Sequence, residues 1–248
     1  MDSTIGAART IEMKTAPRAA TRGHVPGSRK LVTVSPKLAS RSSLGRFLPL
    51  LIHSWLDCGG QPRRTDLIFV LAGRPARKAY ALRLFEEGFA PRILLSVGRF
   101  EIRRFSLQKL PVPIDLLQMA ASIDPPQRHF LVCFEDQVVR VQRIAVGRFG
   151  TLGEIEALAK WLQEHPTIQS VLIVSSGSHL RRVRICCRKL LPARLQIHLV
   201  GVDGEKDDPD EISEKESNVW ILTELLKLPL YRILLSVRRA EAATEEIK

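Results

Sequence analysis

The stretch from Val171 to Pro192 constrains the fold more than any other part of the chain. It opens on the apolar run 171–174 (VLIV), which is short and rich in β-branched residues, as buried strands are. Four small residues follow at 175–178, and apolar side chains then recur at spacings of three and four, the pattern of a helix that packs on a sheet. Pro192 ends this helix, because proline cannot continue the hydrogen-bond ladder. The helix stripe consists of Leu180, Val183, Cys187, Leu190 and Leu191.

The turn between this strand and this helix is the first candidate site. It offers the hydroxyls of Ser175 and Ser176, the imidazole of His179 and the arginines that fall off the apolar stripe. The first N–H groups of a helix lack partners and carry partial positive charge, so we predict a phosphate or carboxylate site here. The alternative is structural, with serines that cap the helix and arginines that are only solvated. The arginines are Arg181, Arg182, Arg184 and Arg188.

Two more buried strands precede this stretch. They are predicted over Asp66–Gly73 and Arg92–Gly98, with a helix over Ala76–Glu87 between them that Gly88 terminates. The continuous apolar character of the first strand indicates a parallel sheet with both faces covered. Strand, helix and strand within about thirty residues form a βαβ unit.

Residues at these strand ends extend the candidate site. Gly73 begins the turn after the first strand, and Arg77 lies at the start of the helix that follows. Ser96 and Gly98 close the second strand. A lone glycine without a G-x-G-x-x-G pattern does not by itself indicate phosphate binding, and Arg77 is either a ligand contact or a solvated charge.

The middle of the chain leaves the parallel pattern. Helices are predicted over Phe100–Ala121, with a break at Pro111–Pro113. Two strand-like runs, Phe130–Phe134 and Val138–Val146, follow each other closely, so we expect an antiparallel excursion here.

An amphipathic helix is predicted over Thr151–Glu164. Thr151 and Glu154 match a capping box, in which a threonine at the N-cap and a glutamate three residues later each bond the other's backbone N–H. Capping alone explains both residues, so a ligand role for them competes with it.

The chain after Pro192 adds a strand over Leu195–Val202 and a helix over Ser217–Leu228 that Pro229 ends. The acidic loop between them, 203–216, lacks the ligand spacing of a calcium loop. We therefore expect one domain over 44–236, with its core over 66–231.

The ends of the chain differ from its middle in composition. Residues 1–43 are rich in small, polar and basic residues without periodicity, so we predict a disordered basic tail there and a frayed tail over 237–248. Residues 1–46 hold nine basic and two acidic side chains, a net charge of +7 within the total of +12. The basic excess is therefore largely a property of the tail and indicates attraction to anionic surfaces.

The segment Leu44–Leu56 is apolar but short and contains Pro49. One prediction is a helix packed on the edge of the domain. The alternative is a helix that lies in a membrane interface beside the basic tail. His53 and Trp55 suit both.

Composition argues against several classes of protein. No apolar run approaches the ~20 residues that span a membrane, and residues 1–30 lack the apolar segment of a secretory signal. Aromatic residues make up only 6% of the chain, and no helix-turn-helix or zinc-finger pattern is present, so no specific nucleic acid is expected. The four cysteines show no metal-ligand spacing, so we expect no metal site and interpret them as reduced packing residues of a cytoplasmic protein.

The pattern of strand ends resembles the YdcF/SanA/ElyC-like family of bacterial proteins over Asp66–Tyr231. The most specific match is a serine-rich turn with a histidine and a downstream arginine, Ser175 to Arg182. The other matching elements are the arginine-headed helix at Arg77, the Ser-x-Gly strand end at Ser96–Gly98, the Thr-x-x-Glu helix start at Thr151 and Glu154, and a late helix with Glu224 before Tyr231.

This resemblance implies a Rossmann-like three-layer α/β/α fold with a mainly parallel sheet. It also implies a link to cell-envelope biogenesis, and one member is reported to bind S-adenosylmethionine. It implies no settled reaction and no catalytic residues, and the cofactor stays unknown.

Two functions follow as hypotheses. The first is a domain that binds or acts on a small anionic ligand, phosphorylated or nucleotide-like. His179 is its general acid or base, Arg77 and Arg182 hold the anion, and Glu154 orients His179 or takes a proton itself. The second is a non-catalytic ligand-binding or adaptor domain that makes peripheral contact with the anionic inner membrane.

Overall fold

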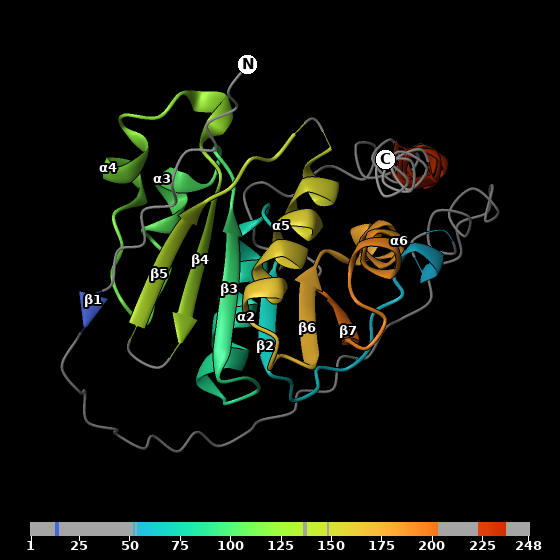
Figure 1. Ribbon diagram of the computed structural model, residues 1–248, viewed down its shortest axis with the longest axis horizontal. Coiled ribbons are helices and arrows are strands. Elements are labelled where there is room, and N and C mark those ends of the chain that lie inside the picture. The colour runs from blue at the N-terminus through green and yellow to red at the C-terminus, as the bar shows by residue number, and fades with distance from the viewer. Residues whose placement is uncertain are drawn as a thin grey trace, which may run out of the picture.

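The computed structural model describes residues 13–14, 52, 54–135, 138–147, 149–202 and 223–236. Over these residues seven strands form one sheet in the order β1-β5-β4-β3-β2-β6-β7 (Figure 1). The strands are Met13–Lys14 (β1), Leu67–Val70 (β2), Arg92–Val97 (β3), Phe130–Glu135 (β4), Val138–Arg143 (β5), Ser170–Ser175 (β6) and Gln196–Gly201 (β7). The helices are Pro75–Glu86 (α2), Ile102–Phe105 (α3), Leu116–Ala120 (α4), Gly150–Glu164 (α5) and Leu180–Leu190 (α6), and residues 223–236 are also helical.

Four adjacent strands, β3, β2, β6 and β7, run parallel to one another. In β2, Phe69 pairs with Leu94 of β3 on one side and with Ile173 of β6 on the other. β4 and β5 continue the sheet beyond β3 as antiparallel strands. The structure therefore confirms an α/β fold with a mostly parallel sheet and an antiparallel excursion after β3.

Alternation along the strands places side chains on both faces of the sheet. Ile68 and Val70 of β2 join a buried cluster with Ala81 of α2, whereas Leu67 and Phe69 join a second cluster with residues of α5 and α6. Figure 1 shows α5 and α6 in front of the sheet and α2 behind it. Helices therefore pack on both faces, as the continuous apolar strands predict.

The stretch from Val171 to Pro192 folds as its pattern predicts. It contributes most of β6, a short 3₁₀ turn over Gly177–His179 and then α6, which ends before Pro192. Leu180, Val183 and Cys187 of the predicted stripe are buried. Local spacing was sufficient to define these elements because each buries one continuous face.

The helix at 223–236 corrects the prediction that Pro229 ends a helix over Ser217–Leu228. Pro229 lies inside the helix, whereas residues 217–222 lie outside the described residues. Tyr231 and Leu235, beyond the proline, are buried against the second cluster. This burial offsets the hydrogen bond that proline cannot make, so the helix continues.

Part of the segment Leu44–Leu56 is described, and residues 52 and 54–56 are helical. Leu56 is buried against Leu228, as expected of a helix packed on the domain edge. Trp55 is half exposed, and the Arg181 guanidinium lies 3.8 Å from the centre of its ring. The remainder of this segment, the predicted tails apart from β1, and the acidic loop after Val202 lie outside the described residues.

The four cysteines are free. Cys133, Cys186 and Cys187 are buried. Burial raises the pKa of Cys133 and Cys186 to about 12, so both remain protonated thiols at neutral pH. These three cysteines pack in the core, as predicted.

Candidate functional site

The loops after β2, β3 and β6 meet the start of β4 at one edge of the sheet. A cavity of about 920 Å³ opens there and is termed the large cavity. Ser96 and Ser176 hydrogen-bond to residues of its lining, whereas Ser175 is fully buried in β6. The predicted site residues that line the large cavity are Gly73, Arg77, Gly98, Thr151, Glu154, His179 and Arg182.

The guanidinium of Arg77 connects two strand ends. Its Nε and Nη2 donate to Ser176 Oγ at 3.0 and 2.8 Å, and its Nη1 donates to the backbone oxygen of Ala72 at 2.6 Å. The residue is only 4% exposed, and burial lowers its pKa to about 10. Arg77 is therefore not the solvated charge of the structural alternative, because it holds the turn after β6 against the loop after β2.

Gly73 makes this position of Arg77 possible. Its φ is +137°, a value that residues with a side chain rarely adopt. A Cβ at this position would lie 2.6 Å from Arg77 Nη1 and 2.9 Å from Arg77 Cζ. The glycine therefore serves both the turn and the close approach of the guanidinium.

His179 lies beside Arg77 as a neutral imidazole. Arg77 Nη2 lies 3.1 Å from His179 Nδ1, and because a guanidinium can only donate, Nδ1 is the acceptor. The proton therefore belongs on Nε2, which lies 3.6 Å from Glu224 Oε1. Burial and then the charges of Arg182 and Arg77 hold the pKa of His179 well below its usual range. With Nδ1 engaged in this way, proton abstraction by His179 requires Arg77 to move.

Glu154 corrects the capping-box prediction. α5 begins at Gly150, one residue before Thr151, and the Glu154 carboxyl turns away from its own helix. Its Oε1 accepts from the backbone N–H of Ala72 at 2.7 Å and from Ser96 Oγ at 2.6 Å. Burial raises the pKa of Glu154 and outweighs these hydrogen bonds, which lower it. Glu154 therefore belongs to the cavity and not to the helix cap.

Ser96 connects Glu154 to a histidine that sequence analysis did not identify. His129 Nε2 lies 2.7 Å from Ser96 Oγ, and burial lowers the pKa of His129 to about 4. The order is carboxyl, serine, histidine, so this chain of groups differs from a nucleophilic serine triad, in which the histidine stands between the other two.

Arg182, predicted to bind the anion, is not the solvated arginine of the structural alternative. It is buried, and its Nη1 donates to Glu224 on the helix at 223–236. Its Nε has no hydrogen-bond partner among the described residues. Its guanidinium also lies 5.4 Å from the centre of the Tyr231 ring. The apolar stripe of α6 did not reveal this burial, because a second helix covers the side of α6 that carries Arg182.

Sequence analysis missed several residues of the large cavity, among them Glu101 and His129. Both left a signal. Glu101 comes three residues after Gly98, at the end of a predicted strand. His129 directly precedes β4, whose first residue pairs with Val97, the last residue of β3. Because β4 runs antiparallel to β3, the start of β4 lies beside the carboxyl end of β3. This places His129 at the site.

The charge of the large cavity is mainly positive. Its two carboxyl groups are Glu101 and Glu154, and the pKa of Glu154 is raised. The two lining histidines, His129 and His179, are neutral at pH 7 because their pKa values are lowered. The basic side chains that line it are Arg77, Arg99, Arg128, Arg182 and Lys227.

Among the residues that the structure describes, no three His, Cys, Asp or Glu side chains gather as metal ligands would. Comparison of the chain with protein-family models, with curated proteins and with solved structures found no match. The geometry and the charge of the large cavity are therefore the observations that bear on function.

Proposed function

We propose that the large cavity binds a small anionic ligand, phosphorylated or nucleotide-like. The observation that carries this proposal is the excess of basic side chains over carboxyl groups in a partly enclosed space. Charge-assisted hydrogen bonds from guanidinium groups suit phosphate oxygens in particular. The position of the cavity, outside the carboxyl ends of parallel strands, is where open α/β sheets bind ligands.

The proposed fold family agrees with this function. We infer that the sheet, with helices on both faces, is a Rossmann-like three-layer α/β/α arrangement. The resemblance to the YdcF/SanA/ElyC-like proteins supports a role in cell-envelope biogenesis and makes S-adenosylmethionine one ligand to test. Arg77, His179, Glu154 and Arg182, which carry that resemblance, all line the large cavity.

The experiment is a calorimetric titration of the full chain with inorganic pyrophosphate, AMP and S-adenosylmethionine. Arg99 is exposed on the cavity wall, so Arg99→Ala removes a cation without opening the core. It should weaken binding of pyrophosphate about tenfold, the effect of one charged hydrogen bond. Arg103→Ala is the control, because Arg103 is also exposed and does not line the cavity. Equal losses in both variants would mean that only net charge matters.

Glu154 is the candidate proton donor if the ligand is also a substrate. A buried carboxyl with a raised pKa keeps its proton closer to neutral pH. Glu154→Gln should abolish turnover of a ligand that co-purifies with the protein and retain its binding. Turnover that survives this substitution assigns the proton transfer elsewhere, and a chain that binds without turnover supports the non-catalytic alternative.

A second candidate function, an adaptor at an anionic membrane, is favoured by the helix at 223–236. Leu226, Leu230 and Ile233 are exposed on it at spacings of four and three, which places them on one face. A basic groove with Trp55 at its edge lies beside this helix, between it and α6. Apolar side chains beside arginines suit the surface of anionic lipid. The groove arginines are Arg181, Arg184, Arg188 and Arg232.

Flotation of the full chain with vesicles tests this adaptor function. Binding to vesicles with anionic lipid should exceed binding to neutral vesicles and should fall with added salt. Replacement of Leu226, Leu230 and Ile233 by serine should remove it. Equal binding by this variant would exclude the helix face. The described helices include none with the length and apolarity to cross a bilayer.

A further inference from the structure

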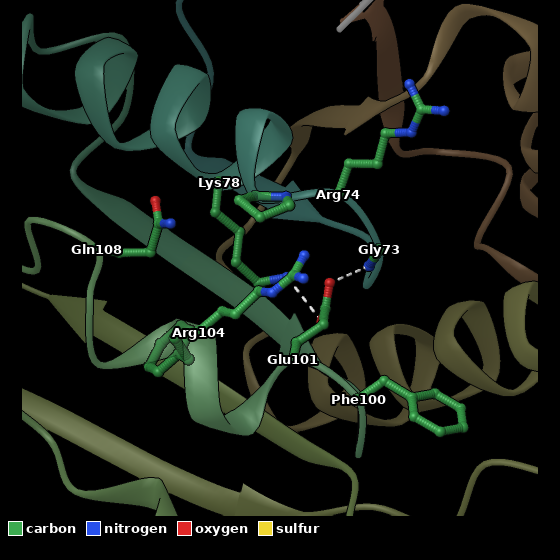
Figure 2. A pocket seen from close by; sticks show the side chains of 9 residues that line it. Gly73, Arg74, Lys78, Phe100, Glu101, Arg104 and Gln108 are labelled. Atoms are coloured by element: carbon green, nitrogen blue, oxygen red, sulfur yellow. Dashed lines mark hydrogen bonds and ion pairs between the residues drawn. The ribbon is translucent and has the colours of Figure 1, made fainter. Parts of the chain in front are cut away.

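The carboxylate of Glu101 lies among three hydrogen-bond donors that converge from two loops and a helix. Figure 2 shows two of them, Gly73 and Lys78. One oxygen accepts from the backbone N–H of Gly73, after β2. The other accepts from the backbone N–H of Gly98, after β3, at 3.0 Å and from Lys78 Nζ on α2 at 2.9 Å. These three donors are termed the Glu101 site.

Donors of this kind bind phosphate and carboxylate groups from other molecules. Backbone N–H groups in turns form concave anion sites, and a lysine ammonium adds a full positive charge. The Glu101 site also lies at the carboxyl ends of two parallel strands, where α/β proteins bind ligands. In other proteins a bound ligand supplies the negative charge at a site of this kind. Here the carboxylate of Glu101 supplies it.

Lys78 favours an anion at this site. Its side chain is only 3% exposed, and burial lowers its pKa while Glu101 raises it. Burial outweighs Glu101, so the pKa is lowered overall, and a counter-charge beside the ammonium helps Lys78 to keep its proton. A group that displaces Glu101 is therefore held most strongly when it carries negative charge.

Glu101 also borders two cavities. Gly73, Phe100 and Glu101 line both the large cavity and a second one of about 310 Å³, termed the small cavity. Lys78 lines the small cavity but not the large one. Because Glu101 accepts from Lys78 Nζ at 2.9 Å, a ligand group that enters from the large cavity competes with Glu101 for this ammonium. The other charged residues of the small cavity are Arg74 and Arg104.

We propose that Glu101 holds the place of a ligand phosphate or carboxylate, which displaces it on binding and is then held by Gly73, Gly98 and Lys78. This role rests on the proposed function, because the same ligand reaches the Glu101 site from the large cavity. Displacement joins the two cavities into one site. Competition by Glu101 lowers the affinity for the anion in proportion to the fraction of molecules in which the Glu101 site is open.

Glu101→Gln tests this competition. Glutamine keeps the length of the side chain and an acceptor for the Gly73 and Gly98 N–H groups, but it has no charge and competes less well. In a calorimetric titration of the full chain with inorganic pyrophosphate, its dissociation constant should be about tenfold smaller than that of the wild type. Glu87→Gln is the matched control for net charge, since Glu87 is exposed and lines neither cavity. It should leave the constant unchanged.

The gain in affinity must depend on Lys78. Lys78→Met in the Glu101→Gln background fills the space of the aliphatic stem without an ammonium, so the tenfold gain should disappear. A thermal melt shows whether this double variant folds. If the double variant does not fold, the dissociation constant of Glu101→Gln alone decides whether Glu101 competes with the anion.

The outcomes separate the two proposals. An unchanged or larger dissociation constant for Glu101→Gln overturns the competition, and the proposed function stands if Arg99→Ala still weakens binding to the wild type. Tighter binding by Glu101→Gln without any effect of Arg99→Ala supports the Glu101 site and overturns the large cavity as the place of the ligand. Absence of pyrophosphate binding by both the wild type and Glu101→Gln overturns both.

Discussion

Arg182 and Glu224 form a buried ion pair between α6 and the helix at 223–236, across 42 positions of the chain. Their side chains are 7% and 1% exposed. Glu224 Oε1 also accepts from Lys227 Nζ at 2.8 Å and lies 3.6 Å from His179 Nε2. The pair therefore ties the turn after β6 to a helix that is distant in sequence, at the wall of the large cavity.

Arg182→Ala should destabilise the protein. It removes one partner of a buried pair and leaves the Glu224 carboxylate without its closest counter-charge, a loss of about 3–5 kcal/mol in the free energy of unfolding. Urea denaturation measures the loss. Arg184→Ala, an exposed arginine of the same helix, is the control and should change stability by less than about 0.5 kcal/mol. Similar values for the two variants would contradict the importance of the pair.

Gly73→Ala should disturb both the turn after β2 and the position of Arg77. The positive φ strains any residue with a Cβ, and the added carbon would overlap the Arg77 guanidinium. We expect a loss of at least about 1 kcal/mol, because alanine is incompatible with this backbone conformation. Thermal melting measures it. Gly60→Ala is the control, since a Cβ at Gly60 meets nothing within 4 Å. A melting temperature equal to that of the wild type would show that the turn adapts to alanine.

Most of the fold could be predicted because its signals are local. The run Val171–Val174 and the spacing of Leu180, Val183 and Cys187 each describe one element that buries one face. The same holds for Gly88, whose φ of +76° fits its predicted place at the end of a helix. Such patterns depend only on near neighbours in the chain.

The candidate site could be predicted only in part, because its geometry depends on partners that are distant in sequence. Glu154 matches a capping box, yet Ser96, 58 positions away, accounts for its orientation. Arg182 falls off the apolar stripe of α6, yet Glu224 buries it. Propensity and capping rules describe a helix in isolation, and tertiary contacts override them.

Glu154→Gln should change how stability depends on pH. Burial raises the pKa of Glu154 in the folded protein above its value of 4.5 in the unfolded chain. The folded state therefore binds this proton more tightly, and the stability that it contributes is lost as pH rises from 4.5 through the folded value. Glutamine has no such proton, so the variant should gain stability relative to the wild type as pH rises from about 4 to about 8. Urea denaturation across this range measures the difference. A difference that does not vary with pH would mean that the carboxyl titrates normally.

His129→Gln should act in the opposite direction. Burial lowers the pKa of His129 to about 4 in the folded protein, against 6.5 in the unfolded chain. Between these values the unfolded chain binds a proton that the folded protein does not, so stability is lost as pH falls from 6.5 to about 4, by about 1.4 kcal/mol per pH unit. Glutamine can still hydrogen-bond to Ser96 Oγ and does not titrate, so the variant should lose less stability over this interval. His165→Gln is the control for a histidine that lies away from the large cavity. Denaturation curves at several pH values between about 4 and about 8 cover the titration. Parallel losses in the wild type and His129→Gln would place the titration on another group.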